Sequence, residues 1–372
     1  MTKPRLPAIE YIRGISMLGV IGIHVGSQYL SNTLANIHLI ALFEIATRFA
    51  VPIFFFISAF GLFYNLDLAR PFDYRGFMRR RFRTVLIPYL VWSAFYILHY
   101  TVLYRDPSLL TPLQILKYLF FGFASYQLYF LVILLWFYPL MPLWIKIVRH
   151  INKSGLLWLL LAQIAFNYYS SFIMNPYGIE NPILKALLIN RLNYWVIHYV
   201  FIFILGGWLA VHSNEFMRFM KERRAAICIF FWASMASLLV YYYKLILLDH
   251  YTPIEAINSA HQLCPPGVLY TVGASLFFFT IFTYPRYPAF LNPALSLLGR
   301  HSYFAYLVHP VAITYLGRMV DSSGRIMTAP LAIGFYCSVV LLAIISAILM
   351  RRLGQHLPII NILTIGVYPK GK

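Results

Sequence analysis

The sequence predicts an all-α, polytopic integral membrane protein with ten transmembrane helices and cytoplasmic N- and C-termini. Of its 372 residues, 61% are hydrophobic and only 11% are charged, whereas soluble domains are about a quarter charged. Apolar runs of about 20 residues recur along the chain, and each is long enough to cross about 30 Å of hydrocarbon. Composition and run length together therefore exclude an ordinary soluble domain.

Each predicted span is one of these apolar runs, bounded by polar, basic or proline-containing segments. In chain order the spans are 8–30, 38–64, 83–104, 126–146, 155–173, 194–212, 225–247, 267–284, 301–317 and 329–350. The segment TPLQILKYLFFGF (111–123) is shorter and amphipathic, which predicts an interfacial or re-entrant helix. No separate soluble domain is visible, so residues 1–372 are expected to form a single integral membrane domain.

The distribution of lysine and arginine supports this count and sets the orientation. With the N-terminus inside, and with the boundary residues Arg83 and Lys146 counted with their cytoplasmic segments, these segments hold 21 of the 30 basic residues, outer segments hold 6, and 3 lie within spans. This excess follows the positive-inside rule. The formal net charge of +19 is therefore explained by topology and by contact with anionic membrane lipid, and we expect no nucleic-acid partner.

The first span contains charged and titratable residues that are costly inside a bilayer. In IEYIRGISMLGVIGIHV (9–25), Arg13 and His24 are 11 residues apart, which places them on one helix face about 16 Å apart. Glu10 precedes Arg13 by three residues, where an ion pair can form. A polar stripe of this kind favours a protein-lined or water-filled path, although an interfacial anchor and a structural histidine remain alternatives.

Each of the other polar residues within the spans has two possible roles, one structural and one functional. Glu44 and Arg48 are spaced i, i+4 and form either a structural ion pair or part of a cavity in which Arg48 stabilises an oxyanion. Ser58 is more typical of helix packing than of a nucleophile. His309 precedes Pro310, whose ring disturbs the helix, so the histidine either supports a kink or lines an active site.

The basic segment RGFMRRRFR (75–83) is expected to be a loop between the second and third spans, and it contains Arg80, Arg81 and Arg83. It fits the positive-inside bias, and a cluster of guanidinium groups also fits phosphate binding. The three cysteines are far apart, and no set of histidine, cysteine and acidic residues has metal-ligand spacing. We therefore expect no metal.

Four stretches resemble, in the same order, the signature blocks of the acyltransferase-3 family of integral membrane O-acyltransferases. The first is the Arg13-x10-His24 pattern, and the others are RFAVPIFFFISAF (48–60), RRRFRTVLIPYLVWS (79–93) and LGRHSYFAYLVHP (298–310). The resemblance covers nearly the whole chain. Ala59 stands where the family usually has glycine, and Arg80 and Arg83 lie one turn earlier than the family's Arg-x-x-Arg pair.

The resemblance implies transfer of an acyl group, commonly acetyl, from cytoplasmic acyl-CoA to a hydroxyl of an envelope glycan or related acceptor. His24 and Arg13 would be the catalytic residues, with His24 acting as a general base or as a transient acyl-imidazole. Arg80, Arg81 and Arg83 would hold the CoA phosphates. Acyl-CoA would be a donor substrate, with no permanently bound cofactor.

The expected location is a cell membrane, as in a bacterial plasma membrane. A transporter or flippase for a lipid-linked glycan is the alternative, because it too would need buried charges in a helical bundle. The absence of visible paired repeats with broken helices favours the enzyme. The sequence leaves the acceptor, the acyl group and the oligomeric state open.

Overall fold

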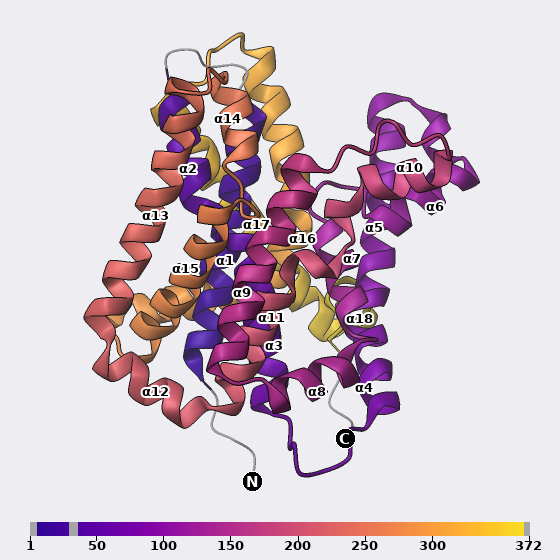
Figure 1. The fold of residues 1–372 in the computed structure, drawn as a ribbon. Coiled ribbons are helices and arrows are strands. Elements are labelled where there is room, and N and C mark those ends of the chain that lie inside the picture. Colours follow the sequence, from indigo (N-terminus) through magenta and orange to yellow (C-terminus); the bar gives the residue numbers. More distant parts are fainter. Residues whose placement is uncertain (1–5, 30–35, 368–372) are drawn as a thin grey trace. The chain divides into compact units, whose positions relative to one another are not determined.

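The computed structural model describes residues 6–29 and 36–367, which form helices and their connections with no β-strand among them (Figure 1). The predicted all-α class is confirmed. The chain divides into two compact units, and each is described by itself. The first comprises Met1–Asp67, Val148–Phe172 and Tyr199–Ile344, and the second Leu68–Ile147, Ile173–His198 and Ile345–Lys372. The prediction of a single domain over residues 1–372 stays a prediction.

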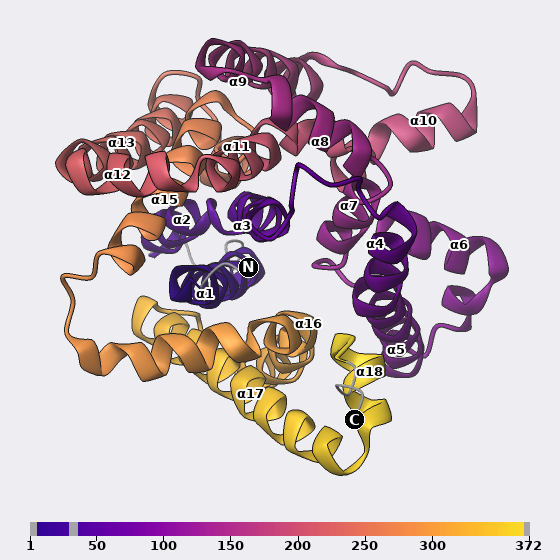
Figure 2. The same cartoon turned by 90° about the horizontal axis from the view of Figure 1, so that it is seen from below.

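The first unit is built around α1, which packs against α2, α3, α15 and α16 (Figure 2). Its helices are α1 (Pro7–Tyr29), α2 (Ile37–Thr47), α3 (Ala50–Tyr64), α9 (Lys153–Tyr168), α11 (Val200–Val211), α12 (Ser213–Glu222), α13 (Arg224–Leu247), α14 (Pro253–Ser259), α15 (Pro265–Thr283), α16 (Asn292–Ser322) and the part of α17 (Ala329–His356) up to Ile344.

Glycines on one face of α1 allow close packing against α2 and α3. A Cβ atom at Gly19 would lie 2.7 Å from the Cβ of Ala50, and one at Gly22 would lie 3.1 Å from the Cγ2 of Thr47. Small residues at this spacing let membrane helices approach until their backbones nearly touch, which maximises dispersion contacts where the hydrophobic effect contributes little. The glycine face therefore fixes which side of α1 remains for its polar residues.

The second unit contains the basic segment and a group of helices around α5. Its helices are α4 (Tyr74–Arg81), α5 (Ile87–Tyr104), α6 (Pro112–Phe121), α7 (Tyr129–Phe137), α8 (Met141–His150, whose last residues belong to the first unit), α10 (Pro182–Ile189), the end of α17 and α18 (Pro358–Ile365). Trp92 Nε1 donates to the carbonyl of Thr364 at 3.0 Å, which ties α5 to α18. The segment predicted as a short amphipathic helix is α6, at ten residues too short to span a bilayer.

The basic segment 75–83 is helical, so its description as a loop was wrong. Asp73 caps α4 by accepting the backbone N–H of Gly76 at 2.9 Å. The helix then continues through a π-helical turn, Phe82–Leu86, into α5. Pro88 lacks the N–H that would bond the carbonyl of Thr84, which accounts for the irregular turn at this point. The arginines therefore project from a helix in several directions.

Judged by length and composition, the described residues contain fewer candidate membrane spans than the ten that were predicted. Among the described residues, seven helical segments are long and apolar enough to cross a membrane, or up to nine if each of two bent pairs counts as one span. The bent pairs, at 68° and 97°, are α7 with α8 and α11 with α12, near the predicted fourth and sixth spans. The predicted span 301–317 lies within α16, whose histidines and arginines lower its hydropathy. Ten spans with both termini inside stays a prediction.

Candidate functional site

The candidate site lies in the first unit, where α1 and α16 bring two histidines together. The rings of His24 and His309 stack with centroids 5.4 Å apart and planes 20° from parallel. His309 is fully buried, at 0% exposure, and His24 is half-buried. The two residues are far apart in the sequence, and the packing of α1 along α16 places them side by side. His309 therefore lies in direct ring contact with the predicted catalytic histidine.

Pro310 explains the orientation of the His309 ring. A proline inside a helix has no N–H for the carbonyl four residues earlier, which here belongs to Tyr306. His309 Nδ1 lies 2.7 Å from this carbonyl oxygen. Because a carbonyl only accepts, Nδ1 must carry the hydrogen, and Nε2 is the acceptor nitrogen of the neutral ring. The adjacent proline thus leads to a defined tautomer of His309.

Arg48 occupies a break within the second predicted span, where α2 ends and α3 begins. The break has the same origin, since Pro52 lacks the N–H that would bond the carbonyl of Arg48. Arg48 Nη2 donates to Glu44 Oε1 at 2.6 Å and to the carbonyl of Ile257 in α14 at 3.1 Å. The predicted Glu44–Arg48 ion pair is therefore confirmed, and it also anchors the connection between α13 and α15.

The Glu44–Arg48 ion pair is largely buried, and some of its polar atoms make no hydrogen bond to the described residues. Glu44 is only 2% exposed. Within the described part of the chain, Glu44 Oε2 and Arg48 Nε are buried and have no hydrogen-bond partner. Buried polar atoms without a partner are costly and point to a site for water or ligand. The charge of Arg48 also acts electrostatically on His24.

A capping box holds the segment that contacts Arg48. Thr252 Oγ1 accepts the backbone N–H of Glu255 at 3.3 Å, and the Glu255 carboxylate accepts the backbone N–H of Thr252 at 2.9 Å. These hydrogen bonds, the backbone bond first, lower the pKa of Glu255 below its usual 4.5. The box fixes the start of α14, the helix whose Ile257 carbonyl meets Arg48.

The predicted polar stripe on α1 is only partly assembled into this site. Arg13 is exposed and, because α1 is continuous, lies about 16 Å along the axis from His24. The carboxylate of Glu10 accepts the hydroxyl of Ser296 in α16 at 2.9 Å. The Glu10–Arg13 pair stays a prediction. Ser58 lies on α3 about 15 Å beyond Arg48 and is half-buried, so it is not brought to the histidine pair.

The arginines of the second unit differ in their surroundings. Arg81 is half-buried, and its guanidinium lies 5.2 Å from the ring centroid of Phe77 and 5.3 Å from that of Tyr138. These cation–π contacts give Arg81 a structural role. Arg80 and Arg83 are exposed. The described residues contain no group of three or more histidine, cysteine or acidic side chains that could hold a metal.

Sequence reasoning missed two carbonyl partners of this site, those of Tyr306 and Ile257. The first had a visible signal, because a proline four residues later always frees a carbonyl. The second had none, since the contact of α14 with Arg48 depends on packing between segments distant in the chain.

The described residues thus define an α-helical protein with several helices suited to a membrane and a buried polar site of histidine, arginine and glutamate. Nearly the whole chain, residues 6–351, matches the acyltransferase-3 family model, which is described as an acyltransferase domain. The chain belongs to this acyltransferase family. No curated protein and no solved structure shows significant similarity to it.

Proposed function

We propose that the protein is an O-acyltransferase that moves an acyl group, acetyl foremost, from cytoplasmic acyl-CoA to a hydroxyl of an envelope glycan, with His24 at the reacting centre. The observation that carries the proposal is the stacked pair of His24 and His309 beside the charge of Arg48, inside a chain of the acyltransferase family. The same family membership favours the enzyme over a transporter or flippase.

His24 suits the role of general base because it is half-buried and has a defined neighbour. Two imidazolium charges with ring centroids 5.4 Å apart repel each other, so the pair holds at most one additional proton. A neutral imidazole can accept the proton of a hydroxyl, which is a poor nucleophile while it keeps that proton. His309 is fixed by its bond to Tyr306 and positions the His24 ring by stacking.

The reaction proposed for this site balances without a cofactor. The acceptor hydroxyl gives its proton to His24 while its oxygen bonds to the thioester carbon, and the carbonyl electron pair moves to the oxygen. Arg48, with a buried Nε–H free of other described partners, stabilises this oxyanion. The tetrahedral intermediate then expels the CoA thiolate, which takes the proton from His24, leaving an ester. Initial acylation of His24 is the alternative order of bond formation.

Arg80 and Arg83 are the residues we assign to the phosphates of CoA. Both are exposed and lie on a helix rich in arginine, and guanidinium groups bind phosphate in a bidentate manner. Arg81 is a weaker candidate because its guanidinium already lies over two aromatic rings. Arg13, exposed on the face of α1 that bears His24, would guide the thioester arm. The proposal places the chain in a bacterial plasma membrane with ten spans and both termini inside.

The decisive experiment uses the protein in lipid nanodiscs with acetyl-CoA and glycans extracted from the envelope of cells lacking the gene. Wild-type protein should release free CoA thiol and add acetyl groups to the glycan, both measured by mass spectrometry. His24→Gln protein serves as the matched control. Acceptor-dependent thiol release that is equal in the two proteins would overturn the assignment of His24. No transfer from any acyl-CoA to any hydroxyl acceptor by wild-type protein would overturn the proposed reaction.

A further inference from the structure

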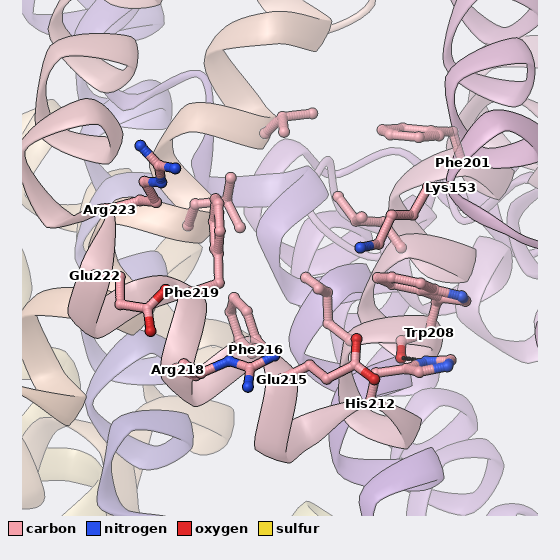
Figure 3. A pocket seen from close by; sticks show the side chains of 14 residues that line it. Lys153, Phe201, Trp208, His212, Glu215, Phe216, Arg218, Phe219, Glu222 and Arg223 are labelled. Carbon is pink, nitrogen blue, oxygen red and sulfur yellow. Dashed lines mark hydrogen bonds between the residues drawn. The ribbon is translucent and has the colours of Figure 1, made fainter.

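A second site is a hollow of about 470 Å³ in the first unit that shares no residue with the histidine site (Figure 3). Its walls come from α9, α11, α12 and α15. Most of the lining is apolar, and the hydrophobic side chains are Phe201, Leu205, Trp208, Leu209, Phe216, Phe219, Val272 and Leu276. A cavity of this volume and character is large enough for a substantial part of a small amphiphile.

Five charged side chains stand around this apolar lining. The cations are Lys153, Arg218 and Arg223, and the carboxylates are Glu215 and Glu222 (Figure 3). Within the part of the chain that the structure describes, no side-chain hydrogen bond or salt bridge is found for any of these five residues. All five residues are exposed, so their charged groups are available to a ligand.

The hollow lies where helices suited to a membrane begin. Lys153 is the first residue of α9, and Arg223 precedes the first residue of α13, both of which can span a bilayer. Between these two positions α12 turns by 97° from α11, as a helix that lies along the membrane surface would do. α12 buries Phe216 and Met220 and exposes its charged residues, as an interfacial helix does. This arrangement would place the charged rim at headgroup level.

The apolar part would then face the region of acyl chains. Further along α9 and α13 from the rim, Trp158 and Ile229 are each 69% exposed, as expected for side chains that contact lipid. A ligand can therefore enter from the bilayer with its chain in the hydrocarbon and its polar end at the rim.

We propose that this hollow binds one phospholipid whose headgroup carries both a phosphate and a primary amine. The guanidinium and ammonium groups of Arg218, Arg223 and Lys153 complement the phosphate. The carboxylates of Glu215 and Glu222 complement the ammonium group, and they disfavour a polyanion such as CoA. The aromatic and aliphatic lining covers the first part of an acyl chain. This inference does not depend on the proposed transfer reaction.

The test measures lipid binding to detergent-purified, delipidated protein by native mass spectrometry and by the rise in thermal unfolding temperature. Phosphatidylethanolamine and phosphatidylglycerol with identical chains are the probes. Wild-type protein should retain one phosphatidylethanolamine per chain and bind it about tenfold more tightly than phosphatidylglycerol. Arg218→Gln with Arg223→Gln should weaken binding of both lipids about tenfold, since each loses phosphate contacts.

Two further variants make the result specific. Glu215→Gln with Glu222→Gln should remove the preference for phosphatidylethanolamine while keeping phosphatidylglycerol binding, and it tests the proposal even if the arginine variant does not fold. Lys221→Gln is the matched control, because this exposed residue of α12 is not part of the lining and should leave both affinities unchanged. Equal affinity of wild-type protein for the two lipids, or displacement of the lipid by soluble CoA, would overturn the proposal.

Discussion

Two substitutions can separate the contribution of the hydrogen bond from His309 Nδ1 to the Tyr306 carbonyl from the contribution of ring stacking. In asparagine, the side-chain N–H₂ falls close to the position of Nδ1, so His309→Asn can still donate to this carbonyl. In glutamine, the amide nitrogen falls close to the position of Nε2 instead. Both variants lose the ring that stacks on His24 at 5.4 Å. They differ in whether the 2.7 Å bond to Tyr306 is kept.

The expected stability difference follows from the backbone. With Pro310 unable to donate, His309→Gln leaves the Tyr306 carbonyl without its side-chain donor in a site where His309 itself is 0% exposed. An unsatisfied buried acceptor costs about 1–3 kcal/mol, so glutamine should be less stable than asparagine by about that amount. Turnover should fall in both variants by about 10²-fold, because a catalytic group displaced by about 1 Å loses that much.

The assay is thermal unfolding in nanodiscs together with acyl transfer per folded molecule for both variants and wild type. Equal stability of the asparagine and glutamine variants would refute the tautomer argument. Wild-type turnover in His309→Asn would refute the role of the ring in positioning His24, whatever the stability. Because the two readouts are independent, a purely structural histidine would lower stability in His309→Gln and leave turnover in His309→Asn intact.

Four other variants test the remaining assignments. His24→Gln should lower transfer by about 10²–10⁴-fold, and retention of a tenth of wild-type turnover would contradict its role as base. Arg48→Lys should lower turnover by about 10²-fold with folded protein maintained, whereas lower stability with normal turnover would indicate a structural pair. Arg80→Ala with Arg83→Ala should weaken acyl-CoA binding about tenfold without loss of membrane insertion; unchanged affinity would remove the donor assignment. Because the pKa of Glu255 is lowered in the folded state, its stabilising effect over Glu255→Gln should be full above pH 4.5 and disappear as the pH falls further; a difference in unfolding temperature independent of pH would contradict this.

The sequence predicted well what depends on local spacing. The i, i+4 relation of Glu44 and Arg48 was enough to predict their ion pair, because one helical turn brings such residues together. Composition was enough for the all-α class. The contact of His24 with His309 was beyond local reasoning, since it depends on which face of α16 packs on α1.

The errors have physical causes that can be named. The basic segment 75–83 was read as a loop because its charges obscure the helix, although Asp73 is a suitable cap and arginine is a good helix former. The predicted span 38–64 agrees with one membrane-length helical segment, Ile37–Tyr64, in which Pro52 disturbs the hydrogen bonding only at Arg48. The predicted span 301–317 lies within α16, but α16 is not among the described helices apolar enough to cross a membrane, because polar residues such as the buried His309 lower its mean hydropathy.

The glycine contacts of α1 have a mechanical consequence for any catalytic cycle. On one side the helix meets α2 and α3 at Gly19 and Gly22, and elsewhere a Cβ at Gly14 would lie 2.9 Å from the backbone nitrogen of Gly299 in α16. Close packing on two sides leaves little room for α1 to slide or rotate against these helices. We therefore expect α1 to be among the least mobile helices of the first unit. We also expect that a movement that admits a substrate involves other parts of the chain more than it involves His24.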